Sequence, residues 1–113
     1  MQATLYHNPR CSTSRNTLAL LRERGIEPRI VHYLEEPLTR EAIAQLIAAS
    51  GLSARQAIRE KEELFQTLGL AQASDEALLD AMAAHPRLLN RPFVVTERGA
   101  RLARPVEKVL EIL

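Results

Sequence analysis

The sequence predicts an α/β fold with a mixed sheet, in the order β-α-β, helices, β-β-α. Three patterns support this order. A strand–helix–strand pattern fills residues 3–34, helical periodicity follows it, and alternating apolar residues return after Pro92. The chain has 113 residues, a length that suits one domain with its own core. We therefore expect a single domain over 1–113, with a helical insertion at about 38–88.

The first part of the chain has the pattern of a parallel strand pair joined by a helix. Residues 3–6 (ATLY) are predicted to form a short strand, and residues 14–24 a helix that ends at Gly25. Residues 29–34 (RIVHYL) are rich in β-forming side chains and predict a second strand. A unit of this length favours parallel pairing with a right-handed crossover.

The middle of the chain predicts three helices. Ile43, Leu46 and Ile47 mark the apolar face of the first, which ends at Gly51. The second is short and ends near Arg59, and the third stops before Pro86. Each helix follows a residue suited to cap it: Thr39, Ser53 (in a capping box with Gln56) and Ser74.

The last part of the chain predicts a hairpin and a closing helix. Residues 93–96 (FVVT) and 100–103 (ARLA) alternate and flank a turn at Gly99. Pro105 occupies the place of a first helical residue. The expected buried face of the closing helix is Val106, Val109, Leu110 and Leu113. This order of elements is that of the thioredoxin-like fold with a helical insertion between its halves.

The composition narrows the classes of function. The net charge of +1 argues against nucleic acid as a partner. The chain shows no signal-like N-terminus and no apolar run of the ~20 residues that cross a bilayer, so we expect a cytoplasmic protein away from membranes. One cysteine excludes an internal disulfide and a Cys-based zinc cluster, and the three histidines are widely spaced. We therefore expect no metal and no bound cofactor.

The only cysteine, Cys11, lies in YHNPRCSTSRNT between the first strand and the first helix. There the unpaired N–H groups and the positive end of the helix dipole favour a thiolate. A fall in pKa from ~8.5 to ~6.5 would raise the ionised fraction at pH 7 from ~3% to ~75%. His7 and Arg10 are candidates to add positive charge, and Ser14 to donate a hydrogen bond. The alternative is a buried, inert thiol, but the polar neighbours favour a nucleophile.

The spacing around Cys11 limits its chemistry. A C-x-x-S motif lacks a resolving cysteine, so any redox cycle needs a thiol from outside the chain, such as glutathione or a partner protein. A phosphatase-type phosphate loop would need Arg at position 17, where Thr17 stands. The sequence therefore predicts a one-thiol site that borrows its second thiol.

Three arginines lie where the predicted structure changes: Arg59, Arg91 and Arg104. In a thioredoxin-like fold the X-Pro bond before the third strand is commonly cis and faces the active-site cysteine, which would place Arg91 beside Cys11. Any one arginine is more often a solvated surface charge. Several guanidinium groups converging on one point would suit a tetrahedral oxyanion.

The segments HNPRCSTSRNT, RQAIRE, LNRPFVV and LARPVE resemble the signature segments of the glutaredoxin-coupled arsenate reductase family, nearly from end to end. The resemblance implies a thioredoxin-like fold and reduction of arsenate to arsenite. It also implies Cys11 as the nucleophile and Arg59, Arg91 and Arg104 as oxyanion-binding residues. His7 and Ser14 match residues that support the thiolate. Many members continue beyond the position that matches Leu113.

The implied reaction uses arsenate, glutathione as a co-substrate, and glutaredoxin as a protein partner. Two other functions stay open from the sequence. A monothiol glutathione-dependent oxidoreductase would need Cys11 but not the arginines. A regulator of the Spx type, which binds RNA polymerase, typically uses a C-x-x-C switch, and Ser14 replaces its second cysteine here.

Overall fold

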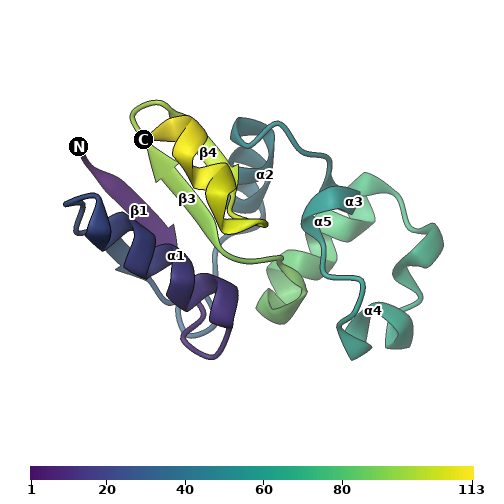
Figure 1. Cartoon of the computed structure of the whole chain (residues 1–113). Helices are drawn as coiled ribbons and strands as arrows, with labels where there is room; N and C mark the ends of the chain where they lie inside the picture. The colour runs from purple at the N-terminus through teal and green to yellow at the C-terminus, as the bar shows by residue number, and fades with distance from the viewer. The chain divides into compact units, whose positions relative to one another are not determined.

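A four-stranded sheet in the order β2-β1-β3-β4 organises one part of the molecule (Figure 1). The structure is a computed structural model that describes residues 1–113. Parallel pairing joins β1 to β2, and antiparallel pairing joins β1 to β3 and β3 to β4. The strands are β1 (Ala3–Tyr6), β2 (Arg29–Val31), β3 (Phe93–Thr96) and β4 (Gly99–Leu102). The mixed sheet predicted from the sequence is confirmed.

The chain forms two compact units, residues 1–36 with 91–113 and residues 37–90. The first unit holds the sheet with α1 (Ser12–Glu23) and the closing helix η3 (Val106–Ile112), drawn in yellow in Figure 1. The second unit is the helical segment that the sequence places at about 38–88. Its helices are α2 (Arg40–Ala49), α3 (Ala54–Ala57), α4 (Glu63–Thr67), η1 (Leu70–Gln72), α5 (Asp75–Ala84) and η2 (Pro86–Leu88).

In the first unit the core lies between one face of the sheet and two helices. Leu5 of β1 and Val94 of β3 are directly paired across the two strands, so their side chains point to the same face. Leu21 of α1 and Val109 and Ile112 of η3 pack against them, and all five side chains are fully buried. At about 25 cal/mol per Å² of buried apolar surface, this cluster is the main stabilising term for the unit.

The register of the sheet brings four chain segments to one edge. Tyr6, the last residue of β1, is paired with Val31 at the end of β2 and with Phe93 at the start of β3. Phe93 is in turn paired with Leu102 at the end of β4. The loops that follow β1, β2 and β4, and the segment that leads into β3, therefore leave the sheet at the same edge.

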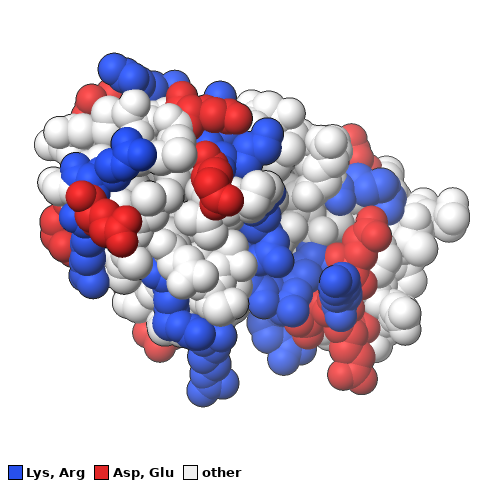
Figure 2. All heavy atoms as spheres, in the orientation of Figure 1, with Lys and Arg blue, Asp and Glu red and all other residues white.

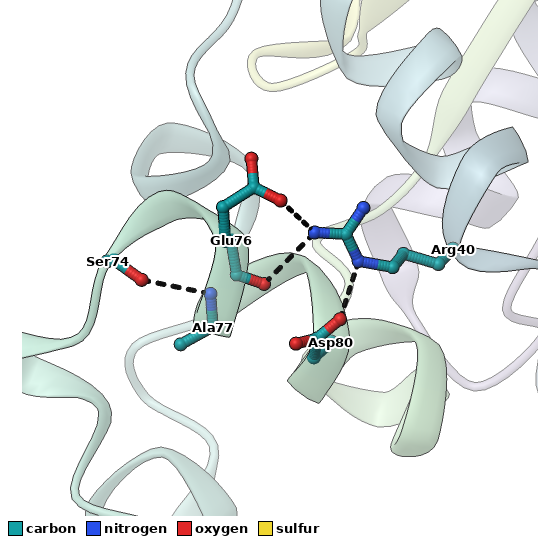
Figure 3. A network of polar contacts seen from close by, with 5 residues as sticks. All are labelled: Arg40, Ser74, Glu76, Ala77 and Asp80. Carbon is teal, nitrogen blue, oxygen red and sulfur yellow. Dashed lines mark hydrogen bonds and ion pairs between the residues drawn. The ribbon is translucent and has the colours of Figure 1, made fainter.

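In the second unit, α5 packs against α2, α3 and η2. Thr39, Ser53 and Ser74 cap α2, α3 and α5 as predicted, and both bonds of the Ser53–Gln56 capping box are present. Arg40 joins α2 to α5, as Figure 3 shows. Its guanidinium contacts the Glu76 carboxylate, and its Nε lies 2.5 Å from Oδ1 of Asp80. These groups are exposed, so helix packing rather than the ion pairs carries most of the stability.

Three boundaries differ from the sequence prediction. α1 begins at Ser12, two residues earlier, because Cys11 is its N-cap. β2 ends at Val31 rather than at residue 34, because the His32 carbonyl accepts hydrogen bonds from the N–H groups of Glu35 and Glu36 and turns the chain. The short helices α4, η1 and η2 were not predicted. None of the helices is both long enough and apolar enough to cross a bilayer.

The buried face of the closing helix also differs from the prediction. η3 is a 3₁₀ helix, whose period of three residues aligns Val109 with Ile112. Both are fully buried, whereas Leu110 is 39% exposed. The prediction that Leu110 lies on the buried face was therefore wrong, because it assumed the period of an α-helix. Pro105 is the N-cap and not the first helical residue.

The 3₁₀ phase of the closing helix makes Ile112 and Leu110 a matched pair for a stability test. Ile112→Ala should lower the free energy of unfolding by about 2–5 kcal/mol, because it removes fully buried methyl groups and leaves a cavity. Leu110→Ala should change it by no more than about 0.5 kcal/mol. Urea unfolding followed by circular dichroism measures both values. Equal losses in the two variants would contradict the 3₁₀ phase.

Candidate active site

Cys11 is the N-cap of α1, at the end of the loop that follows β1. Its backbone is extended, with φ −93° and ψ 122°, as is usual for a residue that precedes the first helical turn. Ser, Thr, Asp or Asn more often occupies this position, where a side-chain oxygen accepts from the free N–H groups of the first turn. A sulfur at the same place receives their partial positive charge instead.

The loop that carries Cys11 is fixed by Asn8. The Asn8 carbonyl accepts from the N–H of Cys11 at 3.0 Å, which closes a four-residue turn with Pro9 in its second position. The Asn8 side-chain oxygen accepts from the N–H of Arg10, also at 3.0 Å. Sequence reasoning did not single out Asn8. The signal was present, because an Asn followed by Pro favours a turn of this kind.

Opposing effects set the pKa of the Cys11 thiol. Burial alone would raise it. The backbone N–H of Ser14, the guanidinium of Arg91 and the N–H of Thr13 together outweigh burial, so the pKa lies below its ordinary value. The structure thus favours a thiolate at neutral pH more than a free thiol does.

Two of the three predicted arginines lie in the same unit as Cys11, and both face it. Arg91 directly precedes the cis peptide bond to Pro92 at the start of β3, and its guanidinium lowers the pKa of the Cys11 thiol. Arg104 follows β4, and its Nη1 lies 4.0 Å from Sγ of Cys11. The same Nη1 donates to the carbonyl oxygen of Arg91 at 3.1 Å, which fixes the two arginines relative to each other.

Arg59 belongs to the helical unit, where it follows the short helix α3. Its N–H donates to the Leu88 carbonyl at 2.7 Å, and its Nη1 lies 3.6 Å from Oε2 of Glu62. Arg87 approaches the other carboxylate oxygen of Glu62 at 3.4 Å. Within its own unit, Arg59 is therefore held by one weak ion pair and one backbone hydrogen bond. Its role toward an oxyanion stays a prediction.

His7 and Ser14 form a buried pair next to the thiol. Nδ1 of His7 lies 2.7 Å from Oγ of Ser14, and the same Oγ accepts from the N–H of Asn8 at 3.0 Å. Burial and the positive charges of His32, Arg22 and Arg15 lower the pKa of His7. His7 is therefore mainly neutral at pH 7, which differs from the expectation that it adds charge. Ser14 acts on the sulfur through its backbone N–H.

The charged side chains elsewhere do not form a field of one sign. Figure 2 shows basic and acidic residues interspersed over the face in view. In α1, for example, Arg22 is engaged by Glu27, with Nε 3.0 Å from Oε1. Arg104, beside Cys11, has no carboxylate within 4 Å. A thiolate with two guanidinium groups around it suits a small oxyanion that a sulfur nucleophile attacks.

The chain is a thioredoxin-like protein with a one-cysteine site. This class is defined by the order of the strands, by the helical segment inserted between the two halves of the sheet, and by the position of the cysteine before the first helix. Within that class, the chain belongs to the ArsC family, whose model matches residues 6–112. An arsenate reductase of Rhizobium meliloti (strain 1021) is 58% identical over 100% of this chain and 82% of its own length. An arsenate reductase of Escherichia coli (strain K12) is 54% identical, over 97% of this chain and 79% of its own.

A solved structure described as an arsenate reductase from Vibrio cholerae has the same fold. It superposes with a TM-score of 0.95 at 49% sequence identity, and the match covers 100% of this chain and 98% of the other. The family resemblance read from the sequence motifs is thus confirmed. The thioredoxin-like fold is confirmed with it.

The groups around the sulfur make its reactivity depend on pH in a defined direction. The rate of alkylation of Cys11 by iodoacetamide should rise with pH around a midpoint below that of a free cysteine, because the pKa of the Cys11 thiol is lowered. Arg91→Ala should move the midpoint upward, because a positive charge that favours the thiolate is lost. Arg24→Ala, which removes an exposed arginine at the far end of α1, is the control. A midpoint unaffected by Arg91→Ala would remove Arg91 from this role.

Proposed function

We propose that the protein is an arsenate reductase that uses Cys11 as its nucleophile and draws its electrons from glutathione and glutaredoxin. The observation that carries this proposal is the meeting of one thiol, Arg91 and Arg104 at one edge of the sheet. Membership of the ArsC family supports arsenate as the substrate. The site residues and the two thiol partners are part of the proposal.

The first step joins the sulfur to arsenic. The Cys11 thiolate attacks As(V), an S–As bond forms, and one arsenate oxygen takes up protons and leaves as water. Attack of an anion on an anion is slow unless positive charge surrounds both. Arg91 and Arg104 supply that charge, and their planar forks match two oxygens of a tetrahedral anion.

The remaining steps transfer two electrons. The thiol of glutathione displaces a second arsenate oxygen as water and forms an S–As–S link. The thiolate of glutaredoxin then attacks the glutathione sulfur, so that a mixed disulfide forms and the electron pair of the broken S–As bond reduces As(V) to As(III). Water releases arsenite and restores the Cys11 thiol. One cysteine in the chain is sufficient, because the disulfide forms between two thiols from outside.

Two features of the cycle follow from the same chemistry. Phosphate has nearly the shape of arsenate but is not reduced by thiols, so it acts as a competitive dead-end ligand. The reaction depends on a reduced glutathione pool, which supports a cytoplasmic location for the protein. No bound cofactor or metal takes part, and glutathione is consumed as a co-substrate.

Removal of the sulfur should stop the reaction but leave arsenate binding intact. Cys11→Ser should abolish arsenate-dependent NADPH oxidation in an assay with glutathione, glutathione reductase and glutaredoxin, because a serine hydroxyl cannot form the thiol adduct. Calorimetry should still detect arsenate binding, since the arginines remain. The background without arsenate is subtracted. Appreciable turnover by the variant would show that Cys11 is not the nucleophile.

The arginines distinguish arsenate reduction from a general glutathione-dependent oxidoreductase. Arg104→Ala should lower kcat/KM for arsenate about 10- to 100-fold, because a charge-assisted bond of about 1.5–3 kcal/mol is lost. The rate on a glutathionylated peptide should change little. A similar loss on both substrates would contradict an oxyanion role for Arg104.

The family resemblance, rather than any contact within its own unit, carries the role proposed for Arg59. Arg59→Ala should weaken arsenate turnover about as much as Arg104→Ala does. Arg87→Ala is its matched control, because Arg87 also pairs with Glu62 but matches no oxyanion-binding position. Equal effects of the two substitutions would attribute the loss to Glu62 and not to the oxyanion.

A further inference from the structure

A cavity of about 270 Å³ adjoins the loop that carries Cys11. One wall is the loop, residues 7–10, and the other is the turn after β2, with His32, Leu34 and Glu35. Both segments leave the sheet where Tyr6 pairs with Val31. The volume is close to the lower end of small-molecule sites, about 300–1,000 Å³. The cavity therefore suits one end of a small ligand better than an entire larger ligand.

The cavity offers one positive and one negative group that the protein itself does not neutralise. Arg10 and Glu35 are both exposed, and neither takes part in an ion pair. The backbone of Arg10 is fixed by Asn8, and that of Glu35 by its hydrogen bond to the His32 carbonyl. The rings of His7 and His32, 6.0 Å apart, lie between these segments. Both charged side chains therefore extend from backbone segments that hydrogen bonds hold in place.

Two other cavities of this unit differ from this one in the partners of their charged side chains or in their distance from Cys11 along the sheet. A larger one, about 690 Å³, follows α1, but its Arg15 donates to the Pro9 carbonyl and its Arg22 is paired with Glu27. A third, about 560 Å³, lies around Met1–Thr4, at the opposite end of β1 from Cys11. Of these three cavities, the one at Arg10 and Glu35 offers a basic and an acidic side chain that make no ion pair and no hydrogen bond to the protein, at the edge of the sheet where Cys11 lies.

We propose that this cavity binds the γ-glutamyl end of glutathione. The inference rests on the proposed function, in which glutathione is the second thiol. The γ-glutamyl end carries one carboxylate and one ammonium group, which Arg10 and Glu35 would pair with respectively. Arsenate or phosphate alone does not fit these groups, because the Glu35 carboxylate repels an anion. A zwitterion uses both charges.

Glutathione is long enough to extend from the cavity to Cys11. Three extended residues span about 10 Å, and Arg10 is the residue directly before Cys11. Because adjacent Cα atoms are about 3.8 Å apart, a tripeptide held at Arg10 is long enough to bring its central thiol to Cys11, where the arsenic adduct forms. The exposed Leu34, 38% accessible, offers apolar contact to the aliphatic part of the γ-glutamyl chain.

Binding can be tested without any arsenate chemistry. S-methylglutathione, whose thiol is blocked, should shift the backbone amide NMR signals of His7, Asn8, Arg10 and residues 32–35 of the full chain in a saturable way. Signals around Met1–Thr4 are the internal control. Shifts confined to other regions, or none up to tens of millimolar, would overturn the inference. This result does not depend on whether the protein reduces arsenate.

Kinetics test the two charges separately. Arg10→Gln and Glu35→Gln should each raise the KM for glutathione about threefold to tenfold, while the KM for arsenate stays unchanged. In Glu35→Gln the alkylation rate of Cys11 should stay unchanged as well. Glu36→Gln and Arg24→Gln are matched controls, because both residues are exposed and neither lines the cavity. An unchanged KM in both cavity variants, with normal arsenate turnover, would overturn the inference and leave the proposed function intact.

Shortened thiols identify the end of glutathione that binds. γ-Glutamylcysteine should retain most of the activity of glutathione, and Glu35→Gln should impair its use to the same degree. Cysteinylglycine, which lacks the γ-glutamyl group, should be a poor co-substrate that Glu35→Gln does not affect further. Strong use of cysteinylglycine by the wild-type chain would contradict the assignment.

Discussion

The stabilisation of the Cys11 thiolate is the constraint on which the site depends. Burial opposes the charged form, so the sulfur needs compensation from fixed positive groups. The first turn of α1 supplies part of this compensation, because its N–H groups have no partner within the helix. These groups belong to the backbone, so no side chain has to be ordered to place them. Arg91 supplies the rest as a full charge. Without this balance, a cysteine at the same place would be a weak nucleophile at neutral pH.

The register of the sheet explains why groups far apart in the sequence meet around this sulfur. Val31, Tyr6, Phe93 and Leu102 lie in one row across the four strands. Cys11 follows that row after β1, Arg91 precedes it before β3, and Arg104 follows it after β4. A slip of one residue between β1 and β3 would move either Leu5 or Val94 out of the core. Core packing and site geometry are therefore fixed by the same pairing.

Much of this arrangement could be predicted, because it depends on local chemistry. Thr39, Ser53 and Ser74 are caps by virtue of their own side chains, and the β1–β2 and β3–β4 pairings follow from the βαβ and hairpin patterns. The 3₁₀ phase of η3 could not be predicted, because Leu110 and Ile112 are equally apolar and only tertiary packing chooses between them. The end of β2 was missed for a similar reason, since a turn after Val31 competes with the β propensity of residues 32–34.

The site itself shows the same division between local and tertiary information. Cys11 and its helix could be located from one short segment. The state of His7 could not, because it depends on burial and on Arg15, Arg22 and His32, which the fold brings near it. A neutral His7 has a physical consequence. It can exchange a hydrogen bond with Ser14 in either direction, whereas a charged ring could only donate. The pair therefore positions the first turn of α1 without adding charge to the pocket.

The partial exposure of Cys11 reconciles two needs of a one-thiol site. A deeper sulfur would be harder to ionise, and thiols from outside would not reach an arsenic atom bound to it. A fully exposed sulfur would lose the benefit of Arg91 and Arg104, because water screens such pairs. Intermediate burial keeps the guanidinium groups effective and leaves one side of the sulfur open. A dithiol enzyme carries its resolving thiol within the fold and can enclose it. This chain has no second thiol, so the opening beside Cys11 is as much a part of the site as the arginines.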